Sequence, residues 1–183
     1  MTNIEIMQTL INRMTNKFVS ESKLIPEDNI ELKFSKISED DWIAKQAIIS
    51  QLKLLGYAAI YMSDSCPASR CLIEVDNSEY HVRYGSMFSD GFLGKKKVQR
   101  NISAELAIQT KNKSGEILFN NILKDQSADT VSVDDIPSLE LTNTKSTHGE
   151  IPPDNILERY VEPFIIIGAT GVAVFLFFHI RTQ

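Results

Sequence analysis

Apolar side chains recur at steps of three and four residues near the N-terminus, the spacing that places them on one side of a helix. Thr2 and Glu5 stand in the order of a capping box where this pattern begins. The sequence therefore predicts a first helix over about residues 3–20. Its apolar stripe consists of Ile4, Met7, Ile11, Met14 and Phe18.

A second helix is predicted over about residues 40–55. The run Ser-Glu-Asp-Asp at 38–41 supplies capping oxygens and negative charge at its start, and Gly56 stands at its end. Its apolar side consists of Ile48, Ile49, Leu52 and Leu55.

Between and after these helices, apolar and polar residues alternate with the two-residue period of half-buried strands. The alternating segments are 30–37, 57–62, 71–75, 80–84, 102–109 and 116–123. The run Asn-Lys-Ser-Gly at 112–115 predicts the turn of a hairpin. The expected fold class is α+β, with two N-terminal helices packed on one face of a mainly antiparallel sheet of about five strands. We assign residues 1–124 to this soluble α/β domain.

Residues 125–160 are predicted to form a polar tether. They are rich in Ser, Thr, Asn and Asp and lack a sustained apolar period. Pro152 and Pro153 favour extended backbone near its end. We expect the tether to hold the domain away from a bilayer.

Residues 161–181 are predicted to form a single-pass transmembrane helix. No side chain is charged from Pro163 to Phe178, and with Ile180 the apolar stretch is about 18 residues, roughly 27 Å of helix. A buried core helix is the alternative, but such a helix rarely follows a polar linker at the end of a chain. The apolar residues of this membrane anchor are Phe164, Ile165, Ile166, Ile167, Val172, Val174, Phe175, Leu176, Phe177 and Phe178.

Charge excludes one class of function. The formal net charge is -5 and the isoelectric point is near 5.2. A nucleic-acid-binding protein needs many Lys and Arg contacts to phosphate, so we expect no nucleic-acid partner.

The residues that carry catalytic or metal chemistry do not gather in any known spacing. His81, His148 and His179 fall in a predicted strand, in the tether and at the end of the apolar stretch. The acidic pairs at 40–41 and 134–135 are typical of helix starts and solvated loops. We therefore expect a chain that is not an enzyme, with no metal, no cofactor and no small-molecule substrate.

Cys66 and Cys71 flank a short segment between two predicted strands, where a hairpin would bring them within disulfide range. The alternative is two unrelated thiols. A disulfide would place the domain in an oxidising compartment.

Lys95, Lys96 and Lys97 end a glycine-containing segment after Tyr84 that is predicted to be a long exposed loop. This basic run is either a solvated loop tip or a contact for lipid headgroups or an acidic partner.

The order of elements resembles that of bacterial envelope proteins of the TolB amino-terminal and curli-assembly-lipoprotein type. The resemblance covers residues 4–124 and rests on the first helix, the strand at 30–37, the Leu-Leu-Gly-Tyr run at 54–57 and the hairpin at 110–118. Glu162-Pro163 and the aromatic anchor also resemble uncharacterised single-pass envelope proteins. The resemblance implies a non-catalytic binding or adaptor domain of the cell envelope, in an assembly or transport complex.

Two arguments about the compartment conflict. Gln8, Thr9 and Arg13 interrupt the first helix where a signal peptide is continuously apolar, so a tail-anchored cytosolic scaffold that recruits a soluble partner is one interpretation. The cysteine pair, the resemblance and Arg181 beyond the anchor favour an extracytoplasmic domain. We expect the extracytoplasmic arrangement at the cell membrane, with the lipid bilayer and another protein as partners.

Overall fold

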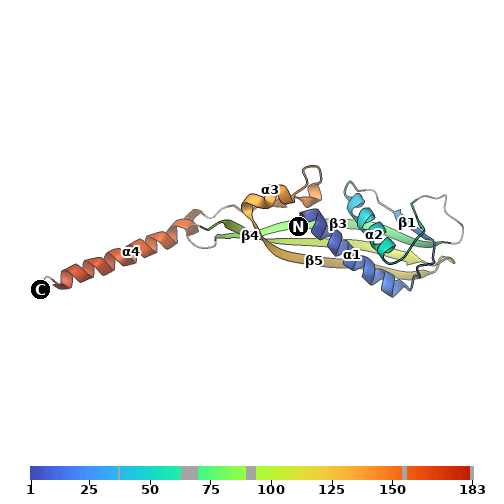
Figure 1. The fold of residues 1–183 in the computed structure, drawn as a ribbon, viewed down its shortest axis with the longest axis horizontal. Coiled ribbons are helices and arrows are strands. Elements are labelled where there is room, and N and C mark those ends of the chain that lie inside the picture. The colour runs from blue at the N-terminus through green and yellow to red at the C-terminus, as the bar shows by residue number, and fades with distance from the viewer. Residues whose placement is uncertain (37, 63–69, 90–93, 154–155, 182–183) are drawn as a thin grey trace.

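The structure is a computed structural model that describes residues 1–36, 38–62, 70–89, 94–153 and 156–181, with side chains of the last segment described for 164–178. In chain order the elements are α1 (Asn3–Ser22), β1 (Ile30–Phe34), α2 (Asp41–Leu54), β2 (Ile60–Tyr61), β3 (Cys71–Ser89), β4 (Lys96–Lys111), β5 (Ile117–Ser132), η1 (Val133–Asp135), α3 (Ile136–Leu139), η2 (Lys145–Thr147), β6 (Gly149–Glu150) and α4 (Ile156–Arg181). They form an elongated α+β domain from which α4 extends (Figure 1).

The sheet is mixed, and the described part contains six strands in the order β2-β1-β3-β4-β5, with β6 also paired to β3. β3, β4 and β5 form a long antiparallel meander. β1 is parallel to both β2 and β3, and the parallel β1–β2 pair is joined by the crossover through α2. The predicted antiparallel sheet is therefore confirmed only for the three long strands.

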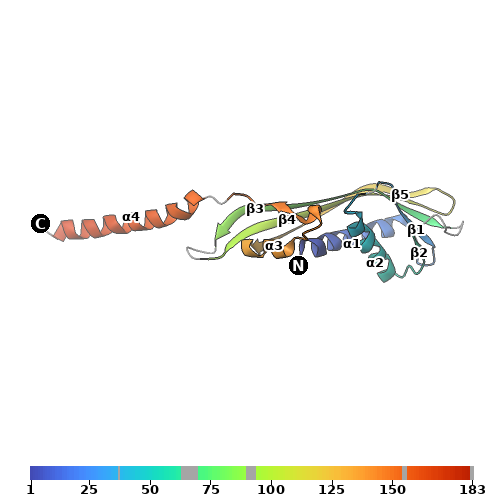
Figure 2. The ribbon, with the colours of Figure 1, turned by 90° about the horizontal axis from the view of Figure 1, so that it is seen from above.

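Both N-terminal helices cover one face of this sheet, as predicted (Figure 2). α1 contacts α2, β4 and β5. The predicted capping box is present, since the Thr2 amide donates to Glu5 Oε2 at 2.7 Å and the Glu5 amide donates to Thr2 Oγ1 at 3.4 Å. The α1 residues Met7, Leu10, Ile11 and Phe18 are fully buried, so the helix packs on the sheet through the predicted stripe.

The expected tether is partly folded. β5 continues through Ser132, so the polar residues 125–132 form the second half of a strand instead of a linker. They escaped prediction because an edge strand that is exposed on much of both faces needs no apolar alternation. After β5, the segment 133–150 folds back onto the domain, and Ile136 is 1% exposed within the hydrophobic core.

α4 begins at Ile156, before the predicted anchor, and its large apolar side chains from 164 to 178 are exposed. Within the described part of the chain, no helix is both long and apolar enough to cross a membrane. The predicted transmembrane helix at 161–181 therefore has no support from the described residues.

Candidate functional site

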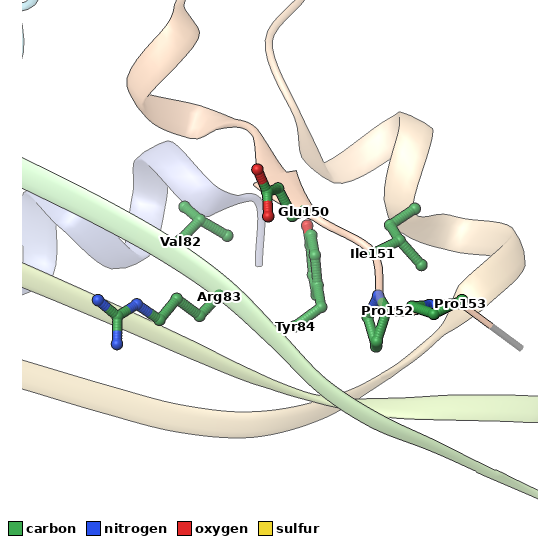
Figure 3. Close-up of a pocket in the computed structure, with 7 residues that line it drawn as sticks. All are labelled: Val82, Arg83, Tyr84, Glu150, Ile151, Pro152 and Pro153. Carbon is green, nitrogen blue, oxygen red and sulfur yellow. The ribbon is translucent and has the colours of Figure 1, made fainter. Parts of the chain in front are cut away.

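The outer edge of β3 is occupied by two different strands. β1 pairs with its first residues, from Cys71 to Val75, and β6 pairs with Val82 and Arg83 further along. At the second junction the chain forms a pocket of about 470 Å³. Seven residues line it, namely Val82, Arg83, Tyr84, Glu150, Ile151, Pro152 and Pro153 (Figure 3).

The pocket has an apolar floor and one charged residue of each sign. The ring of Tyr84 stands between Glu150 and Pro152, and Ile151 lies beside the two prolines (Figure 3). Arg83 extends from the strand in another direction. Ile151 is 46% exposed, so an apolar group entering the pocket would cover a side chain that is otherwise in solvent.

Gly149 allows β6 to approach β3 closely enough to form this pocket. A Cβ atom at this position would lie 2.9 Å from two ring carbons of Tyr84 and 3.0 Å from Val82 Cγ1. Such distances are well inside van der Waals contact, so any larger residue would push β6 away from the strand.

A buried polar network begins at the hydroxyl group of Tyr84. This hydroxyl accepts a hydrogen bond from Asn3 Nδ2 at 3.1 Å and donates one to Glu140 Oε1 at 3.1 Å. Asn3 Nδ2 also donates to the Thr147 carbonyl at 2.7 Å. Burial raises the pKa of the Tyr84 phenol above its ordinary value of 10.0, so the neutral donor form is maintained.

Arg100 continues the network into the sheet. Its side chain is 1% exposed and its guanidinium group pairs with the carboxylate of Asp129 through Nε at 2.8 Å and through Nη2. Nη1 donates to Asn3 Oδ1 at 2.7 Å and to the Met1 carbonyl at 3.1 Å. The charge is therefore satisfied on every side by groups from α1, β5 and the N-terminus.

The carboxylate of Glu140 contacts the residues just before and at the start of β6. Its Oε1 accepts from the Gly149 amide at 3.0 Å, and its Oε2 lies 3.2 Å from His148 Nδ1. The other ring nitrogen of His148 lies 2.8 Å from the Leu141 carbonyl. These contacts close residues 140–149 into a loop that is attached to Tyr84.

Comparison with known proteins leaves the family open. No family model matches the chain, and no curated protein matches it. Among solved structures, a minor lipoprotein from Acinetobacter baumannii is 15% identical over 58% of this chain and 67% of its own, with a TM-score of 0.35. A neuraminyllactose-binding hemagglutinin homolog from Helicobacter pylori is 11% identical over 57% and 68% of the two chains, with a TM-score of 0.31. Similarity at this level carries no argument about function.

None of the residues predicted to be functional lies in the pocket. Cys71 is buried at the start of β3, and burial raises the pKa of its thiol. Cys66 lies outside the described residues, so their disulfide stays a prediction. In the same region, burial acts to raise the pKa of the Asp28 carboxyl group. Hydrogen bonds from Lys113 and the Ile25 amide have a larger opposite effect, so the net pKa lies below its ordinary value of 3.8.

The predicted lysine loop is shorter than expected. β3 continues to Ser89, and Lys96 and Lys97 are the first residues of β4, where Lys97 pairs with Phe88. Of the three lysines only Lys95 precedes the strand, and it is exposed. The alternation was hidden because the register of β3 against β4 shifts between Tyr84 and Met87, which breaks the two-residue period. The role of these three lysines in binding lipid or an acidic partner stays a prediction.

Neither the polar network nor the pocket was predicted from the sequence. Arg100 was detectable, because it occupies the inward-facing phase of β4 between Val98 and Ile102. A charge at such a position must be paired when it is buried. Residues 149–153 carry no comparable pattern.

Among the described residues, no group of three or more His, Cys, Asp or Glu side chains is placed to hold a metal ion.

Proposed function

We propose that this chain is a non-catalytic binding domain that is held at a membrane by α4. One observation carries the proposal: the large apolar side chains described along α4 are between 48% and 70% exposed, from Leu176 to Phe164. A contiguous apolar surface of this kind is rare on a free protein and marks a contact with lipid or protein. None of the α4 side chains that the structure describes, at 164–178, belongs to the hydrophobic core, so we expect the domain to fold without this part of the helix.

The pocket between β3 and residues 150–153 is the proposed binding site. Its lining suits an apolar side chain of a partner protein, with Arg83 and Glu150 available for polar contacts at the rim. The Tyr84 hydroxyl is engaged on both sides by Asn3 and Glu140. It therefore serves to hold the site together, which favours binding over catalysis.

The cell envelope is the proposed location. The support is the sequence resemblance to bacterial envelope proteins, which also suggests an adaptor role in an assembly or transport complex. A cytosolic scaffold attached by its C-terminal helix would have the same structure but the opposite orientation in the membrane.

Membrane attachment is tested by flotation of the full chain with neutral phosphatidylcholine vesicles at high salt. Attachment through an apolar helix resists salt, because it does not depend on screened charges. Recovery of the chain in the aqueous fraction would overturn the proposal. A reporter fused after Gln183 that is active only in the cytosol then separates the two orientations.

The binding site is tested with a photo-crosslinking residue at Ile151. The matched control places the same residue at Asn120, which is exposed on β5. We expect a discrete crosslinked protein from position 151 and none from position 120. Identical adducts from both positions would show that the pocket is not a specific site.

A further inference from the structure

Two segments that are distant in sequence lie at the same end of the molecule. The end of β3 and the start of β4 point toward the end of the domain from which α4 departs (Figures 1 and 2). The start of α2 lies away from that end, beside the middle of β3, where Ser78 donates a hydrogen bond to Asp41 at 2.7 Å. If α4 holds the domain at a bilayer, the β3–β4 hairpin is therefore the part of the sheet that faces the lipid.

The residues at this end have the composition of a membrane-surface contact. Phe88 is 47% exposed and pairs across the hairpin with Lys97. Lys95 is exposed, and Lys96 follows it at the start of β4. Lysines with long apolar stems are favoured where hydrocarbon meets the headgroup layer, and Phe is a usual apolar residue of segments that bind a membrane surface.

Other charges at the same end limit the electrostatic attraction. Asp134 and Asp135 follow Ser132, which pairs with Lys97. The acidic pair offsets part of the positive charge, so lysine attraction alone would be weak. An exposed aromatic ring beside the lysines adds an attraction to the interface that does not depend on charge.

The length of α4 between Ile156 and Phe164 is compatible with simultaneous contact of α4 with the hydrocarbon and of the hairpin with the headgroups. From Ile156 to Phe164, the first described apolar residue, α4 rises about 12 Å. The headgroup layer extends roughly 5 to 8 Å beyond the hydrocarbon on each side. The length of a lysine side chain covers most of the remaining distance, so a hairpin level with the start of α4 reaches the headgroups.

We propose that the hairpin end formed by Phe88 and Lys95–Lys97 is a second membrane contact that binds anionic lipid headgroups. This inference rests on the proposed function, because α4 must first hold the domain at the bilayer. The contact fixes the orientation of the domain, since two points of attachment leave less freedom than one helix.

The test uses the full chain in vesicles with and without phosphatidylglycerol. The chain has one tryptophan, Trp42 at the start of α2, so a single reporter can be moved to the hairpin by Phe88→Trp together with Trp42→Phe. Quenching by brominated lipids measures how close the indole lies to the bilayer. We expect strong quenching at position 88 in anionic vesicles, weak quenching in neutral vesicles, and none at native Trp42.

A triple Lys→Gln variant at 95–97 should lower the quenching at position 88 in anionic vesicles to the level seen in neutral vesicles. The matched control removes Lys17, Lys45 and Lys53, which are exposed on α1 and α2, and should leave the quenching unchanged. Flotation without quenching at position 88 would overturn this contact and leave the proposed function standing. Absence of flotation would overturn both, and equal quenching at Trp42 would overturn the proposed orientation.

Discussion

Replacing Asp129 with Asn should destabilise the domain far more than the same change at Asp125 on the same strand. Both carboxylates pair with an arginine. Asp129 pairs with Arg100, whose side chain is 1% exposed, whereas Asp125 pairs with Arg13, whose side chain is 55% exposed. Each substitution therefore removes one carboxylate from an ion pair. Asp129→Asn leaves a buried guanidinium group without its partner, whereas Asp125→Asn leaves an exposed one.

The expected magnitude follows from the state of each arginine. Removing one partner of a buried pair costs about 3 to 5 kcal/mol, because an uncompensated charge stays in the interior. Asp129 itself is 43% exposed, so water can replace part of the lost contact, and Asn3 keeps its hydrogen bond to the guanidinium group. We expect a loss of about 2 kcal/mol for Asp129→Asn. An exposed pair contributes about 0 to 1 kcal/mol, which is the range expected for Asp125→Asn.

Urea unfolding of the two variants in a chain that lacks residues 161–183 measures both losses. In thermal unfolding, Asp129→Asn should lower the midpoint by about 4 to 8 °C for a domain of this size. If the two variants lose the same stability, the guanidinium group of Arg100 is not buried in solution, and the polar network would have no structural role.

Three further changes test other parts of the structure. Deleting residues 161–183 should abolish flotation and preserve the fold, as checked by circular dichroism and sedimentation; aggregation would contradict this. Gly149→Ala should cost about 1 to 3 kcal/mol, because its Cβ would lie 2.9 Å from the Tyr84 ring. The control Gly85→Ala, where the nearest atom is 3.5 Å away, should cost less than about 1 kcal/mol in the same urea assay. The folded-state pKa of Asp28 is lowered, so its contribution to stability is present above its ordinary pKa of 3.8 and is lost as the pH falls through the folded value. Urea unfolding between about pH 3 and 6 should therefore show a smaller acid-induced loss for Asp28→Asn than for the unchanged chain.

The two helices were predictable because their apolar residues face one large buried surface. In α1 the period of Met7, Ile11 and Phe18 reports directly on contact with the sheet, since all three are fully buried. The capping box could also be found from sequence, because both partners lie within three residues of each other. A helix with one buried side and one exposed side gives the clearest periodic pattern in a sequence.

The strand pairing could not be predicted in the same way. Alternation shows that a segment is a strand, but it does not show which neighbour it joins or in which direction. β1 is parallel to both β2 and β3, and nothing in residues 30–34 specifies this. The second half of β5 is harder still, because much of both its faces is exposed and its composition resembles that of a loop.

The candidate site depends on contacts between distant segments, so only part of it could be read from sequence. Arg100 breaks the apolar phase of β4 and indicates a buried partner, yet its partners Asn3 and Asp129 come from other elements. The pocket needs residues 150–153 to return to β3, and this return depends on Gly149 fitting against Tyr84. A glycine in a polar segment does not by itself indicate such an approach.

The route from α4 to the core links membrane attachment to the pocket. Residues 150–153, which lead toward α4, line the pocket, and Glu140 connects the preceding loop to Tyr84. Beyond Tyr84, the hydrogen bonds of Asn3 lead to Arg100 in the sheet. On the proposed function, a partner side chain that contacts both β3 and residues 151–153 favours one position of α4 over others. If a partner bound in the pocket favours one position of α4, a bilayer that fixes α4 in that position raises the affinity of the pocket by the same factor.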